Sequence, residues 1–187
     1  KNPAPAFTDI HNHWAADNIL FAASRGLLSG TSDTTFSPGT GMTRGMFVTA
    51  LGRLAGINPD SYKTGKFTDV KANAYYSPYV NWAASKGIVS GTTSSTFAPD
   101  SSITREQMAA ILYRYAAYWE LDVSAEADLS AYEDASSVSA YAQAAMQWAV
   151  ANGVINGTSA TTLEPAGTAT RAQAATVLVR FQNSMKS

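Results

Sequence analysis

Several features are missing from this 187-residue sequence, and each absence removes a class of protein. It has no cysteine, which excludes disulfide bonds and thiolate-bound metals. Its 13 basic and 14 acidic residues give a net charge of −1, so no overall field attracts nucleic acid or an anionic membrane. No apolar run is long enough for membrane insertion. No signal peptide is visible at Lys1, and whether an upstream segment has been removed stays open.

Signals for catalysis or a bound metal are equally scarce. His11 and His13 are the only histidines, and without repeated partners they favour a solvated turn over a metal site. The carboxylates between Glu120 and Asp134 favour a linker over a calcium site. The sequence shows no glycine-rich phosphate loop and no nucleophile beside a base, and a glycosidase would need two carboxylates in one groove. We therefore expect no enzyme, with no catalytic residue, no cofactor and no metal.

What the sequence does contain is one pattern that occurs three times, at 30–53, 91–114 and 157–180. Each copy has a Gly-Thr turn, a polar loop with a proline, a Thr-Arg pair and a helical pattern that ends near an arginine. The step from Gly to Thr is 13 residues in each copy (30 to 43, 91 to 104, 157 to 170), and the two arginines are 9 apart. Such agreement without gaps indicates internal repeats.

The residues before each copy repeat as well, with a Phe-Thr-Asp or Tyr-Glu-Asp start and two aromatic residues seven positions apart. Seven residues are two helical turns, so each pair lies on one helix face. Two polar linkers, 56–66 and about 119–129, separate the units. We therefore divide the chain into three units, 7–55, 67–118 and 129–182, each a helix, a long polar loop and a second helix.

The expected fold is all-α, with the three helix-loop-helix repeats closing into one compact pseudo-threefold bundle. Each helix carries an apolar stripe that a single helix pair cannot bury, and an open array would leave an apolar end at each terminus. Thr43, Thr104 and Thr170 are suited to cap the second helices, and Gln107 is placed for a capping box that Met46 cannot complete. We expect binding sites between neighbouring units.

The arginine of each Thr-Arg pair occupies a helical first turn, where a cation is disfavoured by the helix dipole. These residues are Arg44, Arg105 and Arg171. In one interpretation the guanidinium and the free N–H groups of the helix together bind a ligand carboxylate. In the other, it pairs with the aspartate at the start of a unit. These aspartates are Asp9, Asp69 and Asp134. The residues alone leave both interpretations open.

Three further sets of repeated residues are candidates for a site. The turn glycines Gly30, Gly91 and Gly157 fit a backbone with positive φ, and their missing Cβ also leaves room for a sugar. Aromatic residues begin the first helices, where packing in the core is favoured over stacking on sugar rings. They are Trp14, Tyr75 and Tyr141. The later arginines lie near helix C-termini, where capping and solvation are favoured. They are Arg53, Arg114 and Arg180.

The combined pattern FTDI…W…I…A…RGLLSGT…F.P…MTR resembles the S-layer homology domain, whose three tandem copies would cover nearly the whole chain. The resemblance implies a pseudo-threefold helical fold. It also implies non-covalent attachment to secondary cell-wall polysaccharide, an acidic glycan commonly recognised through pyruvylated N-acetylmannosamine. The usual final Glu of the Thr-Arg signature is absent from all three copies, and Leu163 stands where Phe36 and Phe97 stand in the others.

On this resemblance we expect an extracellular cell-wall anchor of a bacterial S-layer or other surface protein, with self-assembly residing in an S-layer region outside this chain. The expected ligand-binding residues are the Thr-Arg arginines, the unit-starting aspartates, the turn glycines and the first aromatic residues. The alternatives are a helical repeat scaffold that binds protein or peptidoglycan, and, behind it, an enzyme. Because the third unit diverges most, we expect Arg171→Ala to cost less binding than Arg44→Ala or Arg105→Ala.

Overall fold

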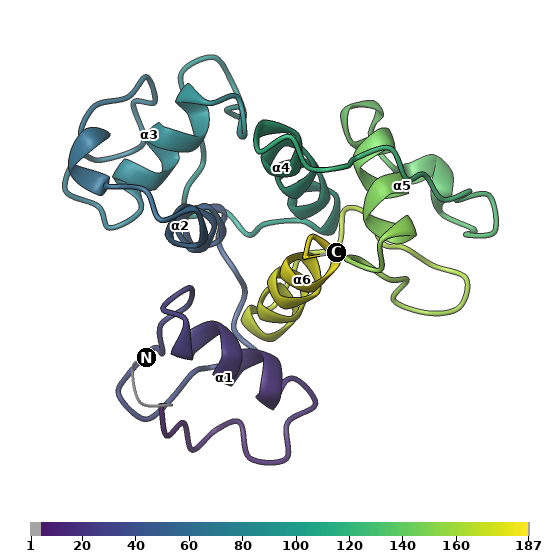
Figure 1. Cartoon of the computed structure of the whole chain (residues 1–187), viewed down its shortest axis with the longest axis horizontal. Coiled ribbons are helices and arrows are strands. Elements are labelled where there is room, and N and C mark those ends of the chain that lie inside the picture. The colour runs from purple at the N-terminus through teal and green to yellow at the C-terminus, as the bar shows by residue number, and fades with distance from the viewer. Residues whose placement is uncertain (1–4, 187) are drawn as a thin grey trace.

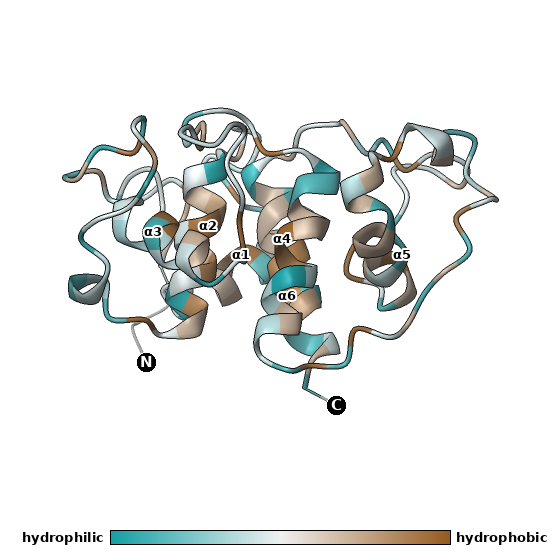
Figure 2. Ribbon diagram, turned by 90° about the horizontal axis from the view of Figure 1, so that it is seen from above, coloured by the Kyte–Doolittle hydropathy of each residue, from teal (hydrophilic) through white to brown (hydrophobic). Residues whose placement is uncertain are grey.

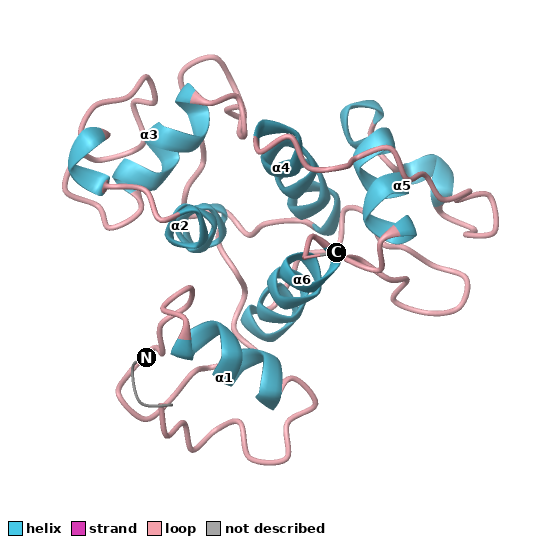
Figure 3. Ribbon diagram, viewed as in Figure 1, coloured by secondary structure: helices cyan, strands magenta, loops and turns pink. Residues whose placement is uncertain are grey.

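The computed structural model describes residues 5–186, and within that range it contains six α-helices and no β-strand (Figure 3). The α-helices are α1 (Ala16–Ser24), α2 (Arg44–Ala55), α3 (Ser77–Ser85), α4 (Arg105–Tyr118), α5 (Gln143–Ala151) and α6 (Arg171–Ser184). Short 3-10 helices occur at Pro59–Ser61, Ala135–Ser137 and Ala140–Ala142. The expected all-α class with two main helices per repeat is confirmed.

The second helices of the three repeats, α2, α4 and α6, lie together at the centre, and α1, α3 and α5 lie outside them as three lobes (Figure 1). The two helices of one repeat do not pair with each other. Instead α3 packs on α2, α5 on α4, and α1 on α6. Each outer helix thus connects its own repeat to another one. The contact between α1 and α6 closes the ring, because it joins the first repeat to the third.

The core follows this arrangement. Figure 2 shows hydrophobic stretches along the central α2 and α4. Trp82 in α3 and Trp148 in α5, the second members of two of the repeated aromatic pairs, are almost fully buried. The loop residues Phe36, Phe97 and Leu163 are fully buried too, so they anchor each polar loop to the body of the molecule.

A ring of backbone hydrogen bonds surrounds the pseudo-threefold axis just before the central helices begin. Met42 N–H donates to Ala169 C=O at 2.8 Å, Ala169 N–H donates to Ile103 C=O at 3.0 Å, and Ile103 N–H donates back to Met42 C=O at 2.9 Å. Every repeat is therefore tied to both others. This cycle matches a closed assembly, as expected, and an open array of repeats could not form it.

The central helices begin where the sequence places them. The Thr43 hydroxyl accepts the Met46 N–H at 3.1 Å, and equivalent caps start α4 and α6. At Thr104 the Gln107 side chain also accepts the Thr104 N–H at 3.0 Å, which completes the predicted capping box. Gly26 follows the end of α1 with φ of 71°, the left-handed conformation expected there.

Candidate functional site

Three equivalent grooves lie between the lobes, one beside each Gly-Thr turn. The first groove has a cavity of about 330 Å³ and is lined by Gly30, Arg53, Tyr75 and Arg171, among others. The second has a cavity of about 480 Å³ and is lined by Gly91, Arg114, Tyr141 and Arg44, among others. The third has a cavity of about 320 Å³ and is lined by Gly157, Arg180, Trp14 and Arg105, among others. The repeated residues of the sequence thus meet in three copies of one site.

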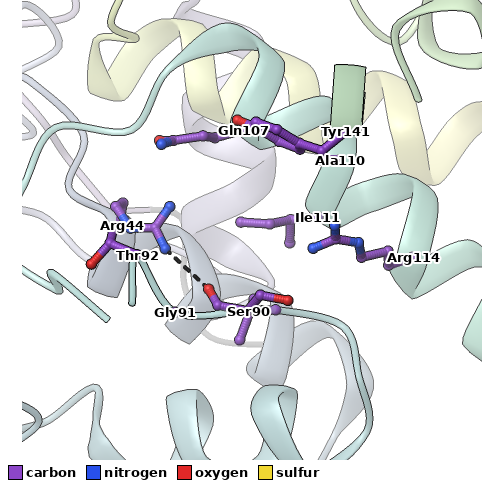
Figure 4. Close-up of a pocket in the computed structure, with 10 residues that line it drawn as sticks. Arg44, Ser90, Gly91, Thr92, Gln107, Ala110, Ile111, Arg114 and Tyr141 are labelled. Atoms are coloured by element: carbon purple, nitrogen blue, oxygen red, sulfur yellow. Dashed lines mark hydrogen bonds between the residues drawn. The ribbon is translucent and has the colours of Figure 1, made fainter. Parts of the chain in front are cut away.

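Each groove takes side chains from all three repeats. In the second groove, Arg44 comes from the first repeat, Gly91 and Arg114 from the second, and Tyr141 from the third (Figure 4). The sequence predicts sites between two neighbouring units. The third contribution arises because the outer helix of each lobe packs on the central helix of the preceding repeat.

The Thr-Arg arginines are largely built into the protein. Arg44 is only 6% exposed, its Nε donates to Phe97 C=O at 3.0 Å, and its Nη2 donates to Ser90 C=O at 3.5 Å. Its guanidinium also lies 4.5 Å from the centre of the Phe97 ring. The same donors of Arg105 and Arg171 hold the corresponding carbonyls of the other two loops. These arginines therefore hold the loops that form the groove walls.

The unit-starting aspartates hold the same loops from the other side. Asp9 accepts the Phe36 N–H at 2.9 Å and the Ser37 N–H at 2.7 Å. Ser37 has φ of 57°, so the carboxylate stabilises a left-handed bend that the loop requires. Asp69 and Asp134 make the equivalent pairs of bonds, and none of the three lines a groove.

Arginine and aspartate are linked through one peptide group rather than by an ion pair. The 36–37 peptide accepts from Arg171 through its C=O and donates to Asp9 through its N–H. Over residues 5–186 the one ion pair is Lys63–Asp60, so the direct pairing of the second interpretation does not occur. Burial lowers the pKa of Arg171, with the charges of Tyr75 and Asp9 acting against that change. Hydrogen bonding from Phe36 N–H lowers the pKa of Asp9.

The helix N–H groups are not free for a ligand. Arg44 N–H donates to Ser101 C=O at 2.9 Å and Gly45 N–H donates to Pro99 C=O at 2.8 Å. The third N–H of α2 is taken by the Thr43 cap, and α4 and α6 show the same arrangement. The sequence-based hypothesis of joint binding by guanidinium and helix N–H groups is therefore wrong, because loops of the next repeat occupy these donors.

The first aromatic residues are exposed in the grooves and not in the core, which corrects the favoured interpretation. Trp14 is 66% exposed, Tyr75 55% and Tyr141 54%. Partial burial still raises the pKa of the Tyr75 and Tyr141 phenols. Both phenols are therefore protonated at neutral pH, and the Tyr141 hydroxyl interacts with the Glu106 carboxylate.

The turn glycines do not have positive φ, so that explanation of them is wrong. They are required by close packing. A Cβ on Gly30 would lie 2.5 Å from both the Phe7 ring and the Ser32 carbonyl oxygen, and one on Gly157 would lie 2.5 Å from the Ser159 carbonyl oxygen and 2.9 Å from the Tyr132 ring. Gly91 is crowded by the carbonyl oxygens of the same tight turn. This turn carries the Ser90 carbonyl that receives Arg44, so the glycine allows the groove wall to form.

The later arginines are the functional candidates that the sequence interpretation missed. Arg53, Arg114 and Arg180 line the grooves, although capping and solvation explain such positions in most helices. The sequence feature that could have identified them is their constant separation of nine residues from the Thr-Arg arginine. Nine residues are two and a half turns, so the two arginines of one helix project from opposite sides. Arg44 accordingly enters the second groove and Arg53 the first.

Within residues 5–186 there is no cluster of three or more His, Asp and Glu side chains that could hold a metal. His13 instead accepts the Ala15 N–H through Nδ1 at 3.1 Å. Nor does any helix in this range combine the length and apolar character needed to cross a membrane.

Fold and grooves together define a closed, three-repeat helical binding module. Residues 6–45, 66–109 and 131–175 match the family of the S-layer homology domain. These matches cover more than half of the chain, and the chain therefore belongs to this family.

Relatives include both enzymes and surface-layer proteins. The chain is 36% identical over 174 residues to an amylopullulanase of Thermoanaerobacterium thermosulfurigenes, covering 92% of this chain and 9% of that protein. It is 35% identical to exoglucanase XynX of Acetivibrio thermocellus, covering 92% of this chain and 16% of that protein. It is 30% identical to the surface-layer 125 kDa protein of Lysinibacillus sphaericus, covering 89% and 14%. The chain thus spans less than a fifth of each.

S-layer homology domains anchor S-layer proteins and cell-surface enzymes to the bacterial cell wall. With three such repeats, this chain is an anchoring module of that kind. Its similarity to the enzymes covers only a small part of each, so it corresponds to an anchoring region in them.

Proposed function

We propose that this module anchors its parent protein by binding an acidic secondary cell-wall polysaccharide in the three grooves, through pyruvylated N-acetylmannosamine. One observation carries the proposal. Each groove combines two arginines, an exposed aromatic ring and a glycine turn, and the lining of none includes Asp or Glu. A positively charged site with an open aromatic face suits a sugar that bears a carboxylate.

The parts of the groove match the parts of such a sugar. An exposed aromatic ring offers an apolar surface for the C–H face of a sugar ring. The arginines offer planar donors for the carboxylate of the pyruvate ketal. The net charge of −1 means that attraction comes from these local cations and not from the whole molecule. The family membership supports the same class of ligand.

Binding to purified wall material tests the proposal. The module is titrated calorimetrically with wall polysaccharide that carries the ketal-linked pyruvate and with the same polysaccharide after its removal. We expect binding that weakens strongly without pyruvate. Equal binding to both would reject the acidic ligand. In a parallel pull-down with sacculi, binding that survives removal of the secondary polysaccharide would favour peptidoglycan or a protein partner.

We further propose that the parent protein carries an S-layer region or an enzyme outside this chain, and that any self-assembly resides there. The names of the relatives support this proposal, since they are longer surface-layer proteins and glycan-degrading enzymes. The module itself would then fix the parent protein at the wall without contributing to its catalysis.

A further inference from the structure

We infer that the ligand's carboxylate is bound by the later arginines, Arg53, Arg114 and Arg180, while the Thr-Arg arginines mainly build the groove walls. The inference rests on the proposed function of the grooves and goes beyond it by dividing the two arginines of each groove between two tasks.

The charge of each Thr-Arg arginine is already matched within the protein. Arg44 donates to Phe97 C=O, and the same peptide group donates from Ala98 N–H to Asp69 at 2.8 Å. A carboxylate therefore faces each of these guanidiniums across one peptide plane, and the other two loops repeat the arrangement. Two of the donor positions of Arg44 are used as well, through Nε and Nη2. A ligand carboxylate would compete with these internal acceptors.

The later arginines have no such partner. Among residues 5–186, no ion pair or hydrogen bond involves the guanidinium of Arg53, Arg114 or Arg180. Arg53 approaches the Tyr79 ring at 5.9 Å, which leaves its N–H donors free. A guanidinium offers five donors in a planar fork that suits a carboxylate. Each groove therefore contains one arginine that is hydrogen-bonded within the protein and one later arginine without such a bond.

The two arginines face the same space from different sides. Figure 4 shows Arg44 and Arg114 on opposite sides of the second groove, with Ser90 and Gly91 between them along one wall. Both are close enough to Tyr141 for their charges to oppose the rise in its phenol pKa that burial causes. A sugar lying across the glycine turn can thus place its carboxylate at Arg114 and its hydroxyl groups near Arg44.

The three grooves differ in how deeply their later arginine is buried and in the volume of their cavity. Arg114 is half-buried, whereas Arg53 and Arg180 are exposed. A charge that is partly removed from water interacts more strongly with an opposite charge. The second groove also has the largest cavity of the three, about 480 Å³. Arg114 should therefore contribute most to recognition of the carboxylate.

The test compares polysaccharide with and without the pyruvate ketal, bound by single Arg→Gln variants at positions 53, 114 and 180 and by the triple variant. Arg25→Gln is the matched control, since Arg25 is exposed and stacks over Phe21 outside the grooves. We expect Arg114→Gln to weaken binding of the pyruvylated form by about tenfold or more, the loss of a charge-assisted hydrogen bond. In the triple variant the two forms should bind alike.

A conservative variant and a stability measurement complete the test. Arg114→Lys keeps the charge and loses the fork, so it should retain part of the preference for pyruvylated polysaccharide. Thermal midpoints of the Gln variants should equal that of Arg25→Gln, which excludes unfolding as the cause. A triple variant that keeps the full preference would overturn the inference while the proposed function stands. A parent protein without any preference would overturn both.

Discussion

The arginine of each Thr-Arg pair stabilises the fold, although its position in a helical first turn suggests little contribution. Arg44 joins two carbonyl groups of a loop in the next repeat and covers the Phe97 ring. Because such carbonyls are costly to leave unpaired, the arginine offsets the unfavourable helix dipole at its own position.

Replacing Arg44 by Ala should lower the free energy of unfolding by about 2–4 kcal/mol, since two carbonyl acceptors lose their donor. Urea denaturation followed by circular dichroism measures this change. Arg25→Ala, at an exposed position, should change the same quantity by less than about 0.5 kcal/mol. Equal stability of the two variants would show that the loop does not depend on Arg44.

The aspartates that clamp the loops should make stability depend on acid pH. The pKa of Asp9 is lowered in the folded protein, chiefly by the hydrogen bond from Phe36 N–H, and that of Asp134 is lowered by Leu163 N–H. A lowered folded-state pKa adds stability above the unfolded value of about 3.9. That contribution is lost as the pH falls through the folded pKa.

Asp9→Asn should therefore destabilise the protein at neutral pH, and the difference from the parent should shrink below about pH 4. Urea denaturation at a series of pH values gives the comparison, and Asp134→Asn should behave in the same way. A difference that stays constant down to pH 2 would mean that the carboxylate charge does not contribute to the clamp.

At the scale of the helix, the sequence predicts most boundaries and few partners. Threonine caps, a left-handed glycine and apolar spacing predict where α1, α2 and α4 begin or end, because these signals act within a few residues. An apolar stripe shows that a helix face is buried but not against which helix. The local sequence pattern therefore does not predict that α1 packs on α6, the second helix of the third repeat.

The same limit explains the errors in the site. The repeated arginines, glycines and aromatic residues identify the grooves, but their roles depend on neighbours from the other two repeats. Arg171 lies in the first groove, whose other lining residues come from the first and second repeats. Arg105 lies in the third groove, which is lined mainly by the divergent third repeat. The reason for ranking Arg171 as the weakest contributor therefore no longer holds.

The start of α2 offers a test of helix capping. Gln107 and Gln173 complete capping boxes in α4 and α6, whereas Met46 leaves α2 with only the threonine half. Met46→Gln should raise the free energy of unfolding by about 0.5 kcal/mol. Gln107→Met should lower it by a similar amount, which makes the two variants mutual controls in one denaturation series. Changes of the same sign would indicate that side-chain packing outweighs the cap.

At the scale of the whole molecule, the three repeats depend on one another as a closed ring. Each outer helix packs on the central helix of another repeat, and the hydrogen bonds among Met42, Ile103 and Ala169 link all three repeats. In an open array, stability is a sum over neighbouring repeats, and a terminal repeat can be lost with modest effect. Here the loss of one repeat removes a helix partner from both of the others.

A chain that ends at residue 128 should therefore fail to fold cooperatively, because α4 loses α5 and α1 loses α6. Circular dichroism and the urea transition compare it with the whole chain. The control is the whole chain cleaved at an engineered protease site at 124–126, where the linker is exposed. The cleaved protein keeps every helix contact and should retain a single unfolding transition. Adding residues 129–187 as a separate fragment should restore a cooperative unfolding transition to the truncated chain. If residues 1–128 alone unfold in a sharp transition with helix content in proportion to length, the repeats behave as an open array and closure contributes little to stability.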